Sequence, residues 1–285
     1  DVPKSSAKTD TVLAKNISLA KGATHTYKIV INYNNSDNVD QSADMGKTLS
    51  GKIFITKASN PTLASKLLED NPTISTRTDF STPFTTNTAN TLYKATENGT
   101  DVYYFAGQDT TSTPINNWVK FGKNSSNQDL YWRIIRTNSD GGVRLLYHGT
   151  STTATDAHIG LSAFNTNNDS PKYVGYMYGD TDATLEEART NTNDSTIKAY
   201  IDNWYANNFT SYTNYLSNDA VYCNDRELAS GASYSTTEGF NFKAYDRLET
   251  NKTPTYDCTN DNDKFTVDAS SGNGKLTYPI ALMTA

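Results

Sequence analysis

Histidine is the side chain best suited to acid–base catalysis near neutral pH, and this chain has three. They are His25, His148 and His158, and none stands in an HExxH motif or beside a GxSxG motif. His148 ends an apolar run and could act as a base, but the sequence spacing fixes no nucleophile or orienting carboxylate beside it. We interpret His148 as a partly exposed structural residue. We predict no catalytic residue, so we do not expect an enzyme.

Neighbouring carboxylates are the second group of residues that could do chemistry. They are Glu186 with Glu187, Asp180 with Asp182, and Asp261 with Asp263. The adjacent glutamates would point about 100° apart on a helix, so they are poorly placed to act together and indicate a solvated helix start. Alternating aspartates can line a calcium loop, but neither aspartate pair has the Gly and Glu that complete an EF-hand. Because such residues also occur in ordinary turns, we predict no metal site and no cofactor, with calcium as the alternative.

The only two cysteines are Cys223 and Cys258. No His or Cys stands at zinc-binding spacing near either of them. The chain is rich in Thr, Asn and Tyr, a composition typical of exported bacterial proteins, and disulfides form in the oxidising surroundings of such proteins. We therefore predict a disulfide between Cys223 and Cys258. Two buried free thiols are the alternative.

Composition and length limit the possible classes of protein. The chain has 285 residues, of which 35% are apolar, and a formal net charge of −6. No run approaches the ~18 apolar residues of a membrane span and no leader-like segment stands at Asp1, so we expect a trimmed or mature chain without a membrane span. The acidic balance without a basic block argues against a nucleic-acid partner.

The first 60 or so residues differ from the rest of the chain. Alternating β-branched residues predict strands at Thr24–Tyr33 and Lys52–Thr56. The polar loop between them contains MGKT, but a phosphate-binding loop would require glycine at the position of Gln41, so we interpret the match as chance. We place a domain boundary between residues 1–59 and 60–285.

Two helices are predicted in the second region. In the first, Asn60 is the expected cap, Pro61 the first helical residue, and the run ends at Asn71. In the second, which follows Ser195, large apolar side chains recur at helical spacing. They are Ile197, Tyr200, Ile201, Trp204 and Tyr205. We interpret this stripe as facing the core, with an aromatic ligand platform as the alternative.

Strands account for most of the remaining pattern, which together with the helices predicts an α+β fold with antiparallel strands. The expected strands are Thr91–Tyr93, Val102–Phe105, Trp118–Phe121, Tyr173–Tyr178, Ala220–Cys223 and Lys275–Leu282. A hairpin is predicted within Asn127–Thr150, where the Asp-Gly-Gly turn at 140–142 tolerates positive φ. We interpret Arg133 and Arg136 of this hairpin as structural, with stems along apolar surface and heads in water or paired with carboxylates.

Longer sequence segments carry a resemblance that covers almost all of residues 61–285. They include VYYFAG, NNWVKFGKNS, DLYWRIIRTNSDGGVRLLYHGT, NDSTIKAYIDNWY, AVYCNDR and NGKLTYPIALMTA. This series resembles a family of exported surface proteins of gut Firmicutes and mollicute-like bacteria. The C-terminal domain of that family is similar to C-type-lectin-like modules and distantly similar to the formylglycine-generating enzyme. The resemblance implies an antiparallel-sheet domain with two or three helices.

A second resemblance concerns the N-terminal segments ISLAKGATHTYKIVINY and QSADMGKTLSGKIFIT. They are similar to the closing strands of the β-sandwich in biofilm-matrix and camelysin-type exported proteins. Members of the first family continue beyond ALMTA, so the two resemblances imply that the sequence begins inside a sandwich and ends before the lectin-like fold closes. We therefore expect the Lys275–Leu282 strand to lie beside another chain or fragment.

The function that these features imply is an extracellular, non-catalytic protein of the bacterial cell surface or matrix. Exposed loops of a lectin-like domain would bind a host, glycan or neighbouring-cell ligand, and the sequence singles out no ligand-binding residue. A structural subunit of an extracellular fibre, self-associated by strand exchange, is the alternative. An enzyme related to formylglycine generation is a weaker alternative, because it would need reactive cysteines or metal ligands.

A bond between Cys223 and Cys258 would close a loop of about 35 residues, which the chain-entropy model converts to roughly 3–4 kcal/mol of stabilisation. We expect the native protein to contain no thiol that alkylates, and reduction to release two. Intact mass after alkylation, with and without reductant, measures this. Two alkylated thiols in the unreduced native protein would contradict the prediction.

Overall fold

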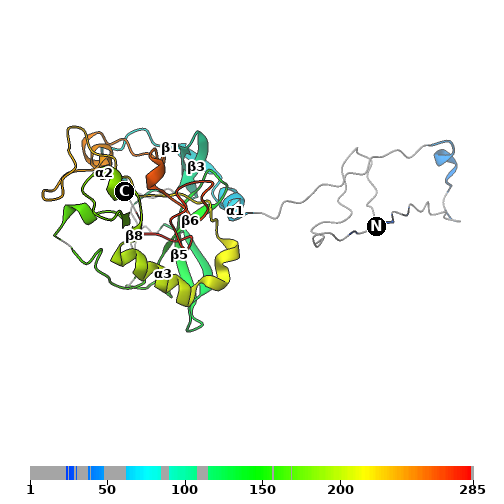
Figure 1. Cartoon of the computed structure of the whole chain (residues 1–285). Coiled ribbons are helices and arrows are strands. Elements are labelled where there is room, and N and C mark those ends of the chain that lie inside the picture. Colours follow the sequence, from blue (N-terminus) through cyan, green and yellow to red (C-terminus); the bar gives the residue numbers. More distant parts are fainter. Residues whose placement is uncertain are drawn as a thin grey trace. The chain divides into compact units, whose positions relative to one another are not determined.

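The computed structural model of the chain describes residues 24, 26–28, 30, 38, 40–47, 62–84, 90–107, 115–155, 157–167 and 169–283. The chain divides into two units, Asp1–Asn60 and Pro61–Ala285, drawn in Figure 1. In the first unit, the described residues contain a short 3₁₀ turn, η1 (Ser42–Asp44). Half of the strand predicted at Thr24–Tyr33 and all of the strand predicted at Lys52–Thr56 lie outside the described residues, so the sandwich stays a prediction.

The second unit is an α+β domain built on a six-stranded sheet. Its strands are β1 (Thr73–Thr76), β2 (Thr91–Glu97), β3 (Thr100–Tyr104), β4 (Trp118–Lys123), β5 (Asp129–Thr137) and β6 (Val143–Tyr147). Their order is β1-β2-β3-β5-β4, and β6 pairs with β5. β1 is parallel to β2, and all other pairs in this sheet are antiparallel. The predicted strands that begin at residues 91, 102 and 118 are therefore confirmed.

The predicted hairpin forms between β5 and β6. The Asn138 N–H donates to Gly142 O over 2.9 Å, and Gly141 has a φ of +82°, a conformation that favours glycine. β5 is the central strand, because residues from both of its faces are buried, including Leu130, Trp132 and Ile134 on one face and Arg133 on the other.

Among the described residues of the second unit, two α-helices have eight or more residues. α1 (Leu63–Asp70) begins after Thr62, whose side-chain oxygen accepts from Ser65 N–H, so Thr62 and not Asn60 is the cap. α3 (Thr196–Asn208) begins directly after Ser195, as predicted, and the Ser195 side chain caps it by accepting from Lys198 N–H. The shorter elements are α2 (Leu185–Ala188), α4 (Lys243–Tyr245), the π turn η4 (Asp246–Thr250) and the 3₁₀ turns η2 (Pro171–Tyr173), η3 (Thr210–Tyr215) and η5 (Asp261–Asp263). The described residues contain no helix with the length and apolar character needed to cross a membrane.

The rest of the domain has little regular structure. Two small antiparallel sheets stand in it: β7 (Met177–Tyr178) with β8 (Asn193–Asp194), and β9 (Tyr222–Cys223) with β10 (Lys264–Phe265). The strands predicted at Tyr173–Tyr178 and Ala220–Cys223 are thus confirmed only over their last two residues.

The strand predicted at Lys275–Leu282 is wrong. The chain bends at residues 277–279, where Pro279 has no N–H to donate to a strand partner. Leu276 is buried, whereas Tyr278 stacks on Tyr205 with ring centroids 4.6 Å apart. Leu276 and Tyr278, two residues apart, thus enter two different parts of the core, which a single strand face would not do.

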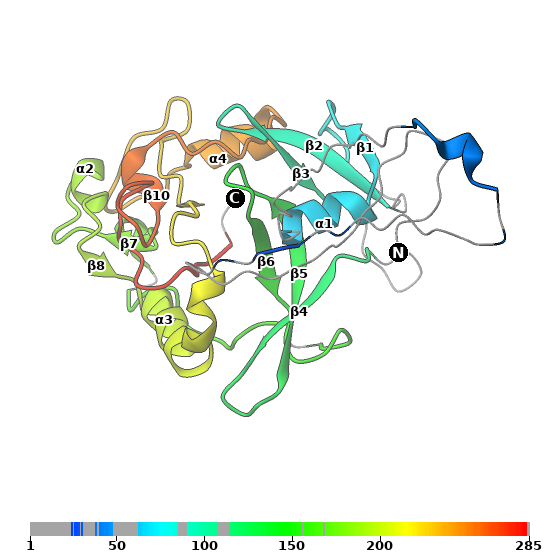
Figure 2. The ribbon, with the colours of Figure 1, turned by 90° about the vertical axis from the view of Figure 1, so that its right-hand side faces the viewer.

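Three buried clusters join these elements, and we name them by position. The α1 cluster is Leu67, Leu92 and Ile134; the sheet cluster is Leu130, Trp132, Tyr205 and Phe209; the C-terminal cluster is Tyr176, Met177, Ile201, Phe265 and Leu276. α3 supplies Tyr205 to the sheet cluster and Ile201 to the C-terminal cluster. The helix therefore links the large sheet to the small sheets, as Figure 2 shows from the side.

The core-facing stripe of α3 is confirmed in its centre and wrong at one edge. Ile201 and Tyr205 are buried, but Tyr200 is 37% exposed and Trp204 is only partly buried. Lys198 is 1% exposed instead, and its Nζ lies 2.7 Å from Asp202 Oδ2. An ion pair thus occupies part of the face that was expected to be apolar.

Tyr205→Ala should lower the free energy of unfolding by about 3–5 kcal/mol, because it empties the centre of the sheet cluster. Tyr200→Ala, one turn away on the exposed side of α3, is the matched control and should change it by less than about 1 kcal/mol. Urea denaturation followed by circular dichroism measures both. Equal losses for the two variants would show that the buried face is assigned wrongly.

Candidate functional site

Arg136 of the hairpin lies in the interior and is paired with a carboxylate. Its Nη2 is 2.6 Å from Glu97 Oε1 on β2, and its guanidinium lies 4.2 Å from the ring centre of Tyr256. Burial alone would raise the pKa of Glu97, but hydrogen bonds from Arg136 and from Ser139 N–H together outweigh it and hold the pKa below 4.5. These contacts join two strands and a distant loop, which supports the structural interpretation.

Arg133 and His148 both pack on the indole of Trp118. The guanidinium of Arg133 lies 3.9 Å from the ring centre, and the imidazole of His148 meets the same residue edge-on with centroids 4.4 Å apart. Burial, with a smaller contribution from the positive charge of Arg133, lowers the pKa of His148 below 6.5. Residue His158 is exposed, and His25 lies outside the described residues. Of the two histidines that the structure describes, His148 packs on Trp118 and His158 is exposed, and a grouping that includes His25 is not tested.

Of the acidic residues considered for calcium, Asp261 and Asp263 are paired with basic side chains, whereas both carboxylate oxygens of Asp182 lack a hydrogen-bond partner among the described residues. Asp263 is wholly buried and accepts from Arg226 Nε over 2.7 Å, while Asp261 pairs with Lys264 over 2.7 Å. In the other pair Asp182 is buried and Asp180 is exposed. Over the described ranges, no three His, Cys, Asp or Glu side chains are grouped so as to hold a metal ion.

The adjacent glutamates do lie in the first turn of α2. Glu186 is exposed, but Glu187 accepts from the N–H groups of Thr181 (3.1 Å) and Ala183 (2.9 Å). Hydrogen bonds from Thr181 and Ala183 lower the pKa of Glu187. Glu187 thus closes the turn before the helix. The prediction that it is merely solvated missed these hydrogen bonds.

A buried arginine that the sequence did not single out organises the irregular part of the domain. Besides Asp263, the guanidinium of Arg226 donates to Met177 O over 2.8 Å, to Ala188 O over 3.0 Å and to Asn191 Oδ1 over 2.8 Å. The acceptors come from three segments, since Ala188 and Asn191 are three residues apart, so one side chain ties together β7, the end of α2 and η5. Nothing in the local sequence marks Arg226, because its partners lie 35 or more residues away.

The two cysteines form a disulfide. The Cα atoms of Cys223 and Cys258 are 5.7 Å apart, and the bond spans 35 residues of sequence. It ties β9 to the loop that follows η4. The disulfide prediction thus agrees with the structure.

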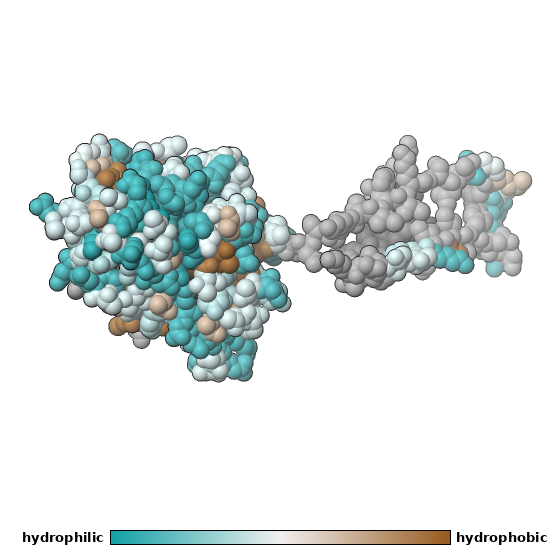
Figure 3. Space-filling model, viewed as in Figure 1, coloured by the Kyte–Doolittle hydropathy of each residue, from teal (hydrophilic) through white to brown (hydrophobic). Residues whose placement is uncertain are grey.

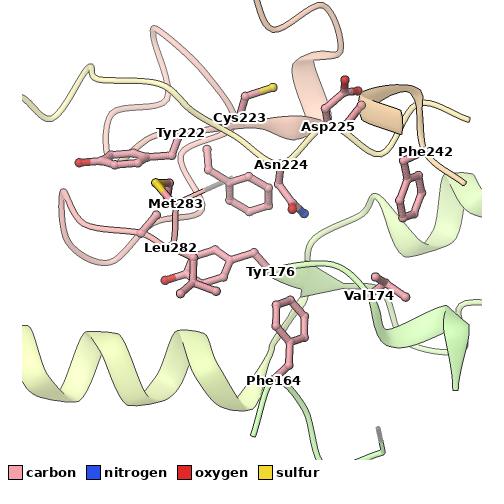
Figure 4. Close-up of a pocket in the computed structure, with 13 residues that line it drawn as sticks. Phe164, Val174, Tyr176, Tyr222, Cys223, Asn224, Asp225, Phe242, Leu282 and Met283 are labelled. Carbon is pink, nitrogen blue, oxygen red and sulfur yellow. The ribbon is translucent and has the colours of Figure 1, made fainter. Parts of the chain in front are cut away.

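Next to this disulfide the domain contains a cavity of about 240 Å³. Its walls are mainly aromatic and aliphatic side chains from segments far apart in the chain, drawn in Figure 4. They include Phe164, Val174, Tyr176, Phe242, Phe265 and Leu282. Val174 is 47% exposed and Met283 is 76% exposed, so the cavity opens to solvent. The face of the second unit in Figure 3 is otherwise mostly hydrophilic, with small separate hydrophobic patches.

Two residues that line this cavity have a buried polar atom without a partner among the described residues, Asn224 and, at its hydroxyl, Tyr176. The main-chain N–H of Asn224 donates to Asp263 O over 3.0 Å, but its Nδ2 is buried without a hydrogen-bond partner among the described residues. Figure 4 shows the amide directed into the space among the aromatic side chains. A buried amide donor without a partner costs about 1–3 kcal/mol, so it needs a reason. Sequence reasoning missed Asn224, since an Asn after a cysteine carries no distinguishing pattern.

Comparison with protein-family models, with curated proteins and with solved structures finds no match to this chain. The resemblance to exported surface proteins and their lectin-like domain therefore stays a prediction.

The Glu97–Arg136 pair gives the protein a specific dependence on acid. Because the pKa of Glu97 is lower in the folded chain, the stability that the carboxylate contributes is present above about pH 4.5 and is lost as the pH falls through the folded pKa. Glu97→Gln should therefore lower the free energy of unfolding by about 1.5–3 kcal/mol at pH 7, and by less at pH 3. Urea denaturation at both pH values measures this.

The matched control is Asp101→Asn, which removes the exposed Lys94–Asp101 pair between the neighbouring strands. Exposed pairs contribute little, so this variant should stay within about 1 kcal/mol of the unmodified protein at both pH values. A Glu97→Gln loss that is independent of pH would contradict the assignment of an ionised Glu97.

Proposed function

We propose that the protein is an extracellular, non-catalytic binding protein of the bacterial cell surface or matrix, whose C-terminal domain has a C-type-lectin-like fold. The observation that carries the proposal is an open, largely apolar cavity beside a disulfide. Disulfides persist in oxidising compartments, and concave, mainly apolar cavities with a few polar groups are the usual form of ligand sites.

The arrangement of the domain supports binding by loops. After β6 the chain runs through long irregular segments held by side-chain hydrogen bonds, and these segments carry the cavity. Rigid scaffolds that position loops are a common basis for recognition. The chemistry of the site supports a non-catalytic role, since both cysteines are bonded to each other and the strongest ion pairs join segments of the fold.

A fibre subunit is the second candidate, and a specific feature favours it. β1 and β4 stand at the two ends of the strand order, and within the described residues each pairs with a strand on one side only. Such edges can accept a strand from another copy. Enzymatic formylglycine chemistry is a weaker candidate, because it would require a reactive thiol or metal ligands.

The test is binding of the fluorescently labelled chain to a glycan array and to intact host and bacterial cells. We expect saturable binding that excess unlabelled protein abolishes, with the ligand recovered unchanged by mass spectrometry. The double variant Cys223→Ser, Cys258→Ser is the control and should bind more weakly, because the loop that the disulfide holds is released. Concentration-dependent filaments without ligand binding would favour the fibre, and a chemically altered ligand would favour the enzyme.

A further inference from the structure

The cavity beside the disulfide has the properties of a site for one particular class of ligand. We propose that it binds a compact, uncharged apolar molecule that carries a single carbonyl oxygen, which accepts a hydrogen bond from Asn224 Nδ2. This inference deepens the binding role proposed above and rests on it. It names the chemistry of the ligand, which the proposed function leaves open.

The size of the cavity limits the ligand. An apolar cavity of about 150 Å³ holds a benzene molecule of six non-hydrogen atoms. In proportion, the cavity of about 240 Å³ holds a molecule of about ten non-hydrogen atoms. A disaccharide or a peptide segment is larger than this.

The polarity of the cavity walls further limits the class of ligand. The side chains around the space are largely hydrocarbon, and two of them carry a buried polar atom that lacks a partner among the described residues, Asn224 Nδ2 and the Tyr176 hydroxyl. Figure 4 shows the Tyr176 hydroxyl directed away from the Asn224 amide, so Asn224 Nδ2 is the donor that faces the space. A sugar or a peptide backbone would bring several donors and acceptors into the cavity, and each one left without a partner would weaken binding. A single acceptor oxygen, by contrast, would satisfy the amide while the rest of the ligand contacts hydrocarbon.

Charge excludes ionised ligands. Asp225 lies in the wall, and its carboxylate is already paired with Arg247 and accepts from Glu227 N–H over 3.2 Å. An anion would be repelled by this carboxylate, and a cation would lose its hydration without gaining an unpaired counter-charge. Ketones, esters and amides with an apolar body are the remaining chemistry.

Two molecules of nearly the same shape test the proposal. Acetophenone carries a carbonyl where α-methylstyrene carries a methylene, and both have nine non-hydrogen atoms. We expect the full chain to bind both, with acetophenone tighter by about two- to tenfold, the range of one neutral hydrogen bond. Isothermal titration calorimetry measures the affinities. Acetophenone alone should shift the side-chain amide signals of Asn224 in the ¹H–¹⁵N spectrum.

Asn224→Leu keeps the approximate shape and removes the donor, so it should bind the two molecules equally. Ala244→Phe places a ring in the cavity from a lining residue that has no polar role, and should abolish binding of both. Melting curves check that each variant folds. If Asn224→Leu does not fold, Ala244→Phe still tests whether the two molecules bind in the cavity.

Three outcomes would overturn the proposal. They are the absence of binding to the unmodified chain, an acetophenone preference that survives in Asn224→Leu, and displacement of acetophenone by N-acetylglucosamine. Failure here is distinguishable from failure of the proposed function. Acetophenone binding without any cell or glycan partner would leave the cavity assigned and remove the surface role. Cell or glycan binding without acetophenone binding would leave the surface role and remove the assignment of the cavity.

Discussion

The hydrogen-bonding requirement of one buried guanidinium determines the irregular half of the C-terminal unit. Arg226 is 3% exposed, and a charge so far from water is tolerated only where its donors find acceptors. Its acceptors are the carboxylate of Asp263 and carbonyl or amide oxygens of two other segments. Loss of this side chain would leave Asp263 buried without its main counter-charge. It would also remove the one group to which all of these segments are hydrogen-bonded.

The hairpin arginines extend the same principle to the disulfide. Arg136 lies against Tyr256, two residues before Cys258, and Arg144 donates to Val221 O over 2.9 Å, two residues before Cys223. Both segments that the disulfide joins are therefore also held from the sheet. This answers why a central strand pair carries arginines. Their stems pass along apolar surface while their heads reach loops that an aliphatic side chain could not hold.

Elements with a regular pattern of burial were predictable from the sequence, and irregular ones were not. The hairpin and α3 repeat large apolar residues at the spacing of a strand or a helix, so local sequence is sufficient to find them. β7 to β10 have two residues each, too few to show any period. The Lys275–Leu282 segment alternates like a strand because its side chains enter separate parts of the core.

Individual polar residues were also missed. Lys198 lies within the buried face of α3, where apolar residues were expected, because an ion pair with Asp202 compensates its burial. Arg226 and Asn224 gain their roles from residues far along the chain, and no local pattern reports such contacts.

The same network explains why the cavity stays open. A cavity in a domain held by apolar packing tends to shrink as its walls relax toward each other. Here Arg226 fixes Met177 and Asp263 by hydrogen bonds. Tyr176 directly precedes Met177, and Phe265 follows Asp263 by two residues, so both cavity walls are held in place. Asn224 is fixed in turn by its N–H bond to Asp263 O and by the neighbouring disulfide. Collapse of these walls would break directional bonds in a buried setting, where each is expensive to lose. A cavity maintained in this way is formed before any ligand arrives, so little of the binding free energy is spent on ordering its walls.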